Sequence, residues 1–305
     1  MILCAGEALI DMLPRRTAEG EDAFAPHAGG SVFNTAVALG RLGAPVRFFS
    51  GLSSDLFGDR LRAVLDGAGV DHSLALTSGR PTTLAFVRLR DGQATYTFYD
   101  ENSAMRMLRS EDMPPSDAAD VLFFGCISLA AEPCGAAYEG LMLAAAPDRV
   151  TMVDTNVRPS FVEDERGYRD RLLRMTGAAD IVKASDEDLR WLEGDGDLAD
   201  LARGVLERGA RIVCVTEGAR GVTAYRREGA IHQPAVPAEV VDTVGAGDTF
   251  NAGLLAGLHE AGALTKAALA GLEEETLRGA LELGARAAAV TVSRAGANPP
   301  RRDEL

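Results

Sequence analysis

The segment Val241–Phe250 combines small residues with an acid in a way that suits chemistry on a phosphate. Gly245, Ala246 and Gly247 let the backbone approach a ligand closely, so that successive N–H groups can point outward. Apolar residues follow at helical spacing as far as Leu258, which predicts a helix that begins near Gly247. The positive end of its dipole would face the same ligand. The segment therefore predicts an anion-binding cradle at a helix N-terminus.

Asp248 stands directly behind this cradle, where a carboxylate would repel a bound phosphate. One explanation is that it accepts the proton of an attacking hydroxyl during phosphoryl transfer. The alternative is that it complements the helix dipole and that the glycines form an ordinary turn. A dinucleotide fingerprint is excluded because Phe250 stands where the third glycine is needed, and no Gly-Lys-Ser/Thr sequence of a P-loop is present.

The elements that must position these residues alternate along the chain. Short β-rich runs are separated by segments that suit helices, which predicts an α/β fold with a mostly parallel sheet covered by helices on both faces. The expected strands are Ile2–Leu9, Val46–Phe49, Val121–Phe124, Val150–Val153, Ile181–Val182 and Ile212–Val215. The expected helices are Asn34–Leu42, 133–146, 164–177, 197–208 and most of 248–289. We find no linker, and we expect one domain over residues 1–305.

Polar side chains follow several of these strands. Asp11 follows the first, Asp154 to Arg158 follow the strand of the 150s, Lys183 to Asp188 follow the next, and Thr216 follows the last. Ligands of open α/β sheets bind outside the carboxyl ends of the strands. The sequence therefore predicts one site at that edge. From Thr82 an alternating pattern with a turn at Asp91-Gly92 predicts a β-hairpin.

The motifs together resemble one family. Asp242 to Phe250 is similar to the C-terminal signature of the PfkB (ribokinase-like) carbohydrate kinases, and Gly29 to Gly43 resembles their Gly-Gly-x-x-x-Asn segment. Further similar pieces occur in family order: Gly51–Asp59, Asp154–Pro159, Val182–Asp188, Thr216–Gly221 and Gly296–Ala297. Within the family, the sequence is most similar to bacterial fructokinases and related sugar kinases.

This resemblance implies a ribokinase-like fold in which segments near 12–28 and 82–103 form a small β-sheet lid. It implies transfer of the γ-phosphoryl group of ATP to a sugar hydroxymethyl group, with Asp248 as the base and Gly245, Ala246 and Gly247 as the anion cradle. The implied sugar contacts are Asp11, Gly29, Gly30 and Asn34, with Arg158 near the transferred group or an acidic part of the substrate.

The resemblance also implies residues around the nucleotide and its cations. Lys183, Ser185, Thr216, Gly218, Gly221, Gly296 and Ala297 match positions that border ATP. Ser185 and Asp188 replace the usual Asn and Glu near the Mg²⁺ waters, and Glu187 could share that task; both replacements keep oxygen donors. Asp242 and the Val244 carbonyl match a monovalent-cation (K⁺) site of several relatives. Without the resemblance, Ser185 to Asp188 would be interpreted as an ordinary helix start. Arg158 would be a surface residue in a loop, and Lys183 would pair with the acids 186–188.

Composition limits the partners. The formal net charge of −14 argues against binding to nucleic acid or to an anionic membrane surface. Cys4, Cys126, Cys134 and Cys214 are scattered, so we expect free thiols rather than a zinc site or disulfides. We expect a cytoplasmic protein, because the first residues carry no basic signal-peptide region and no apolar run approaches ~20 residues.

Fructose is the expected substrate, and 2-keto-3-deoxygluconate or another sugar or nucleoside is the alternative within the family. Kinases of sugar acids often have Arg where Asp100 stands here, which favours a neutral sugar, although Arg88, Arg90 and Arg106 are nearby. A non-catalytic sugar or nucleotide sensor is the alternative from another class. Lid strands often pair between subunits in relatives, so a homodimer through the lid is a further expectation.

Overall fold

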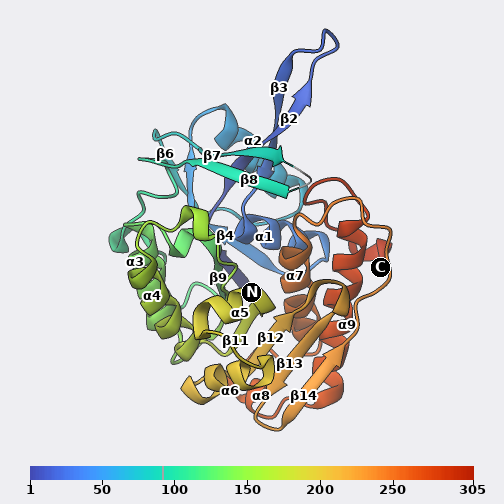
Figure 1. Cartoon of the computed structure of the whole chain (residues 1–305). Coiled ribbons are helices and arrows are strands. Elements are labelled where there is room, and N and C mark those ends of the chain that lie inside the picture. The colour runs from blue at the N-terminus through green and yellow to red at the C-terminus, as the bar shows by residue number, and fades with distance from the viewer. Residues whose placement is uncertain (91–92) are drawn as a thin grey trace.

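The computed structural model describes residues 1–90 and 93–305 (Figure 1). Its main element is an eight-stranded sheet with the strand order β14-β13-β12-β11-β10-β9-β1-β4. The six strands from β12 to β4 pair in parallel, and β13 and β14 add an antiparallel edge. The predicted fold class, a mostly parallel sheet covered by helices, is confirmed.

The strands of this sheet are β1 Ile2–Ala5, β4 Val46–Phe49, β9 Val121–Gly125, β10 Val150–Asp154, β11 Ile181–Ser185, β12 Ile212–Thr216, β13 Val222–Arg226 and β14 Gly229–Gln233. The α-helices are α1 Ser31–Arg41, α2 Leu56–Gly67, α3 Cys134–Ala145, α4 Glu165–Ala178, α5 Asp186–Glu193, α6 Leu198–Arg208, α7 Ala246–Glu260, α8 Lys266–Ala270 and α9 Glu274–Val292. A short parallel pair, β5 Gly51–Ser53 and β6 Leu76–Ser78, lies apart from the main sheet.

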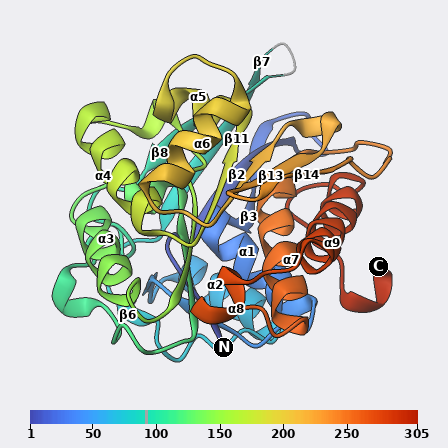
Figure 2. The ribbon, with the colours of Figure 1, turned by 90° about the horizontal axis from the view of Figure 1, so that it is seen from below.

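The two faces of the sheet have separate cores because side chains alternate along each strand. On one face Cys4, Phe123 and Met152 pack with residues of α1, α7 and α9. On the other face Leu3 and Phe124 pack with residues of α3, α4 and α6. Figure 2 shows the two helical layers on opposite sides of the sheet.

A second sheet of four strands, the lid sheet, has the order β3-β2-β7-β8. Its strands are β2 Leu9–Arg16, β3 Asp22–Gly29, β7 Thr83–Arg90 and β8 Gln93–Tyr99. The β2–β3 hairpin extends away from the rest of the molecule (Figure 1). Both segments that the resemblance implied for a lid therefore contribute strands to one sheet. The turn expected at Asp91-Gly92 lies outside the described residues.

The first strand was predicted wrongly. The apolar run Ile2–Leu9 is divided between two sheets: β1 ends at Ala5, and Leu9 begins β2. Asp11 therefore lies inside a lid strand, opposite His27 of β3 and Ala85 of β7, instead of following a strand of the main sheet. Hydrophobicity alone cannot reveal this change of sheet, because both strands are buried there.

Within the described ranges, none of the helices has the length and apolar character that crossing a membrane would need.

Candidate active site

A cavity of about 270 Å³ lies where the lid sheet meets the carboxyl ends of the main strands. In the main sheet β1 lies between β4 and β9, so the strand order changes direction there, which is where open α/β sheets bind ligands. The cavity is lined by residues that follow β1, β9 and β10, by the end of β11, by the starts of α1 and α7, and by lid strands. They are Glu7, Leu9, Asp11, Gly30, Ser31, Asn34, Tyr96, Phe98, Cys126, Ile127, Asn156, Arg158, Lys183, Thr243, Val244, Gly245, Gly247 and Asp248.

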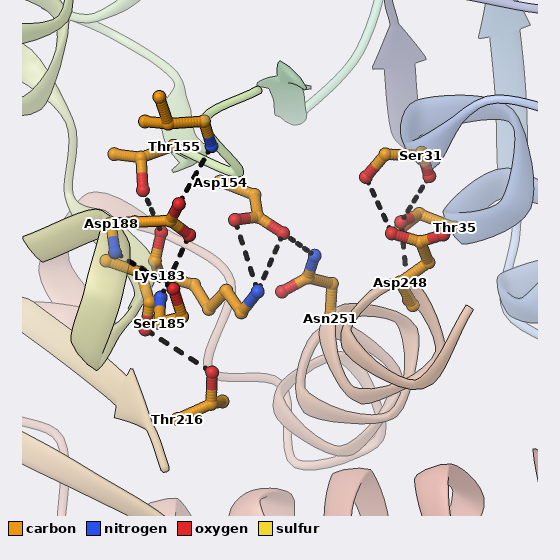
Figure 3. Close-up of polar contacts among 12 residues, drawn as sticks. Ser31, Thr35, Asp154, Thr155, Lys183, Ser185, Asp188, Thr216, Asp248 and Asn251 are labelled. Carbon is orange, nitrogen blue, oxygen red and sulfur yellow. Dashed lines mark hydrogen bonds and ion pairs between the residues drawn. The ribbon is translucent and has the colours of Figure 1, made fainter. Parts of the chain in front are cut away.

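Asp248 lies in the first turn of α7 and is buried. Its carboxylate accepts hydrogen bonds from two side chains at the start of α1: Ser31 Oγ lies 2.6 Å from Oδ1, and Asn34 Nδ2 lies 2.9 Å from Oδ2. Thr35 Oγ1 also donates to the Asp248 main-chain carbonyl at 3.2 Å (Figure 3). The first turns of the two helices are thus joined at this carboxylate.

Two opposing effects act on the pKa of Asp248. Burial raises it, and the bonds from Ser31 and Asn34 and the charge of Lys183 lower it without cancelling the effect of burial. The pKa of this carboxyl is therefore above its ordinary value. A carboxylate of raised basicity accepts a proton more readily.

The glycine segment in front of Asp248 has the geometry of a cradle. Gly245 has φ +79°, the left-handed region, and it precedes the first residue of α7. A Cβ there would lie 2.7 Å from Cβ of Ala297, so the segment packs directly on the loop that follows α9. A Cβ at Gly247 would lie 3.0 Å from Nζ of Lys183. A larger residue at 245 would meet the Ala297 backbone. The Ala246 N–H donates to the Thr243 carbonyl at 3.3 Å, and the next N–H groups at the start of α7 have no acceptor within the helix.

Asp11 approaches the cavity from the lid sheet. A Cβ at Gly29 would lie 2.2 Å from its Oδ2, so a larger residue at position 29 would displace this carboxylate. Gly30 has φ +105° and precedes α1. Burial and the nearby charge of Asp248 raise the pKa of Asp11 to about 7. The carboxyl group therefore changes its charge near neutral pH.

Lys183 does not pair with the acids 186–188, contrary to that expectation. Its buried Nζ lies 3.1 Å from Oδ2 of Asp154, whose side chain is fully buried at the end of β10. Asn251 Nδ2 donates to the same oxygen at 2.7 Å, one turn of α7 beyond Asp248 (Figure 3). Lys183 lines the cavity, but its charge is balanced by Asp154.

Ser185 and Asp188 form the helix start that the residues alone indicated. Ser185 Oγ accepts from the N–H of Asp188 at 3.0 Å, and Asp188 Oδ2 accepts from the N–H of Ser185 at 3.2 Å, which is a capping box (Figure 3). Asp188 Oδ1 accepts from the N–H of Val157 at 2.9 Å. Each carboxylate oxygen keeps a further lone pair for a hydrated cation. Glu187 is exposed.

Asp242 ties the cradle to the loop after α9. Its Oδ1 accepts from the N–H of Val244 at 3.0 Å, and its Oδ2 accepts from the N–H of Gly296 at 2.9 Å. Gly296, at φ +69°, and Ala297 therefore lie beside the Gly245 segment.

Thr216 ends β12, and a turn follows in which Gly218 has φ +56° and Gly221 has φ +100°. A Cβ at Gly221 would lie 2.2 Å from the carbonyl oxygen of Gln233. Several expected residues do not line the described cavity: Gly29, Ser185, Glu187, Asp188, Thr216, Gly218, Gly221, Asp242, Ala246, Gly296 and Ala297.

Comparison with known proteins identifies the family. The model of the pfkB family of carbohydrate kinases matches residues 1–304. The chain belongs to this family. It is 50% identical over 279 residues to a fructokinase of Rhizobium leguminosarum bv. trifolii, covering 91% of this chain and 86% of that protein. It is 36% identical over 263 residues to a fructokinase of Klebsiella pneumoniae, covering 83% of this chain and 82% of that protein.

The fold of this PfkB kinase is similar to that of a solved fructokinase of Xylella fastidiosa with bound ATP. The TM-score is 0.89 at 32% identity, covering 97% of this chain and 93% of the other. The recognition from motifs is therefore confirmed, and the protein is a carbohydrate kinase, a phosphotransferase that acts on a sugar.

Reasoning from the sequence missed several residues of this site. Glu7 is fully buried yet lines the cavity, and its only signal is a charge inside the apolar run that begins the chain. Ser31 is adjacent to the Gly-Gly motif, but nothing in the sequence indicates its bond to Asp248, 217 positions away. Asn156 has φ +33° and Cys126 has φ +58°, which only the backbone reveals.

Proposed function

We propose that this PfkB kinase phosphorylates fructose on a hydroxymethyl group with ATP as the donor. The similarity to fructokinases over most of the chain supports the reaction. The observation that carries the mechanism is Asp248, buried behind the Gly245–Gly247 cradle and held by two donors from α1.

In this mechanism the sugar hydroxymethyl oxygen attacks the γ-phosphorus as its proton passes to the Asp248 carboxylate. The bond between the γ-phosphorus and the bridging oxygen breaks, and that oxygen leaves with ADP. The N–H groups at the start of α7 stabilise the charge that develops on the phosphoryl oxygens. Arg158 lines the same cavity and supplies a fork-shaped donor for these oxygens.

On the sugar side we propose Asp11, Gly29, Gly30 and Asn34 as the contacts. Asp11 and Asn34 offer hydrogen-bonding groups, and the two glycines let the ring approach the backbone. On the nucleotide side we propose Lys183, Ser185, Thr216, Gly218, Gly221, Gly296 and Ala297.

Two cations complete the proposal. Ser185, Glu187 and Asp188 present hydroxyl and carboxylate oxygens, which suit a hydrated Mg²⁺ carried mainly by the ATP phosphates. Such an ion would neutralise phosphate charge during transfer. Asp242 and the Val244 carbonyl are the proposed K⁺ site, and Asp242 already uses both oxygens to hold the cradle. Comparing activity in K⁺ with activity in Na⁺ tests this second ion.

A neutral sugar fits this cavity better than a sugar acid. Arg106, a cation near the lid, is already engaged: its Nη1 lies 3.0 and 3.1 Å from the two carboxylate oxygens of Asp100. Glu7, Asp11 and Asp248 place acidic groups around the cavity. ADP release measured with fructose, ribose, adenosine, fructose 6-phosphate and 2-keto-3-deoxygluconate tests the choice. A higher kcat/KM for the acid than for fructose would contradict it.

Asp248→Asn tests the base. An amide fits the same place, because the Ser31 hydroxyl can accept from the new NH₂ group while the amide oxygen still accepts from Asn34. We expect kcat to fall by about 10²–10⁴-fold, the usual effect of losing a general base, with fructose and ATP still binding in calorimetry. Activity close to wild type would reject the assignment. Binding of both ligands without turnover in the wild-type protein would instead favour a sensor.

We further propose one catalytic domain over residues 1–305 and a homodimer formed through the lid sheet. Phe24 and Tyr99 are 45% and 57% exposed and pack on either side of Phe86, with ring centroids 5.0 and 5.5 Å from its own. An apolar surface of this kind suits a second copy of the chain. Light scattering of the wild type and of Phe24→Ser tests the dimer, and a wild-type monomer at micromolar concentration would contradict it.

ATP as donor and four free, buried cysteines favour a cytoplasmic location.

A further inference from the structure

We propose that Glu7 is a positioning residue for Asp248: it fixes the start of α1, and through α1 the two side chains that hold the base. The inference rests on the role proposed above for Asp248.

Glu7 replaces the missing N-terminal cap of α1. The residue before this helix is Gly30, which has no side chain to accept from the free N–H groups of the first turn. Glu7 Oε1 accepts from the N–H of Val32 at 3.0 Å instead, from 25 residues earlier in the chain. The cap thus comes from residues 6–8, the corner between the end of β1 and the start of β2 in the lid sheet.

The backbone of this corner also touches the start of α1. A Cβ at Gly6 would lie 2.6 Å from Cγ2 of Val32, and a Cβ at Gly30 would lie 2.9 Å from the carbonyl oxygen of Glu7. The two segments are packed at two glycines and joined by one side-chain bond. A change at Glu7 therefore acts on the first turn of α1 directly.

That first turn carries both side-chain donors to Asp248. Ser31 and Asn34 bind its two carboxylate oxygens at 2.6 and 2.9 Å. If the turn moves, the carboxylate loses its orientation towards the attacking hydroxyl. Displacements of about 1 Å in a reacting group can lower turnover by about 10²-fold.

Burying the Glu7 carboxyl costs folding free energy. Its side chain is fully buried, and Oε2 has no hydrogen-bond partner among the described residues, since the nearby Ser128 hydroxyl donates to the Gly125 carbonyl. Burial raises the pKa of this carboxyl. An unpartnered buried oxygen destabilises a fold, and such groups persist where function requires them.

The test compares Glu7→Gln with Glu7→Met in the full-length protein. Gln keeps an oxygen that accepts from Val32, whereas Met has a similar length and no comparable acceptor. We expect Glu7→Gln to keep kcat within about threefold of wild type. We expect Glu7→Met to lower kcat by about 10- to 100-fold. In both variants the KM for ATP should stay unchanged, because the Glu7 side chain bonds to α1 and not to a residue proposed for the nucleotide.

Melting temperatures are measured alongside, and kinetics are run well below them. We expect Glu7→Met to melt within a few degrees of wild type. Asp180→Asn is the matched control: Asp180 is a buried acid that accepts from Thr151 N–H and pairs with Arg211 and Lys266. It should lower the melting temperature and leave kcat unchanged.

Two results would overturn the inference: full kcat in Glu7→Met, or equal losses in Glu7→Gln and Glu7→Met. The second would mean that the acid itself, rather than its acceptor oxygen, is needed. Asp248→Asn, assayed in parallel, separates this inference from the proposed function. An inactive Asp248→Asn beside a fully active Glu7→Met removes only the role of Glu7, whereas an active Asp248→Asn removes the base itself.

Discussion

The pKa of Asp11 predicts that fructose binding depends on pH around neutrality. Burial and the negative charge of Asp248 raise this pKa to about 7. Above that pH the carboxylate accepts hydrogen bonds from sugar hydroxyls with a full charge, and below it the group is protonated. With a pKa of about 7 the ionised fraction is about nine-tenths at pH 8 and about one-tenth at pH 6. If the ionised form binds fructose, the Kd should rise by up to about tenfold from pH 8 to pH 6.

Calorimetry measures the Kd for fructose at each pH. ATP is left out, because its own phosphates titrate in this range. Asp11→Asn should bind fructose more weakly at pH 8 and lose the pH dependence. In Asp248→Asn the pKa of Asp11 should fall, because a like charge is removed, so that the change in affinity moves to lower pH. His27 stands opposite Asp11 in β3, and His27→Gln controls for its charge. A constant Kd from pH 6 to pH 8 in the wild type, or the same slope in Asp11→Asn, would refute the reasoning.

Two further predictions concern the buried charges and the cradle. Asp154→Asn leaves the buried Lys183 without its counter-charge, so the free energy of unfolding should fall by about 3–5 kcal/mol in urea denaturation. The control is Asp200→Asn, which breaks an exposed ion pair and should change the free energy of unfolding by less than about 1 kcal/mol. Equal losses of stability in the two variants would contradict the value expected for Asp154→Asn. Gly245→Ala and Gly262→Ala both place a side chain at positive φ, at a cost of about 1–2 kcal/mol each. Only Gly245→Ala meets a neighbour, so it alone should lower kcat, by about 10²-fold; equal kcat values would contradict the cradle.

The sequence allowed the parallel strands to be predicted because each is a short apolar run that ends in polar residues. Val46–Phe49 was predicted with its observed bounds, and β9, β10 and β12 were predicted one residue short at their carboxyl ends. The prediction for β11 ended at Val182, three residues before the observed end. The antiparallel edge, β13 and β14, was not predicted, because its strands are only partly apolar. The division of Ile2–Leu9 between two sheets depends on tertiary contacts that no local pattern contains.

The sequence likewise predicts some features of the candidate site and not others. Its main-chain features could be predicted, since glycine at Gly30 or Gly245 indicates a backbone that other residues cannot adopt. Its side-chain contacts could not. Lys183 illustrates this: Asp180 and Asp186 are each three positions away in the sequence, yet its partner is Asp154, which is 29 positions away and lies on the adjacent strand. Partners across a parallel sheet are set by register, and register follows from the whole core.

The charges around the cavity support the proposal that ATP enters together with a cation. The lining contains three carboxyl groups, Glu7, Asp11 and Asp248, and two cationic side chains, Arg158 and Lys183. Since Asp154 already balances Lys183, Arg158 is the other cationic side chain of the lining and the one we propose for the phosphoryl group. ATP without a metal would add negative charge beside Asp248 and raise the pKa of a base that must be ionised. A cation bound to ATP would offset that negative charge, so we expect the ionised state of Asp248 to be favoured when ATP enters as a metal complex.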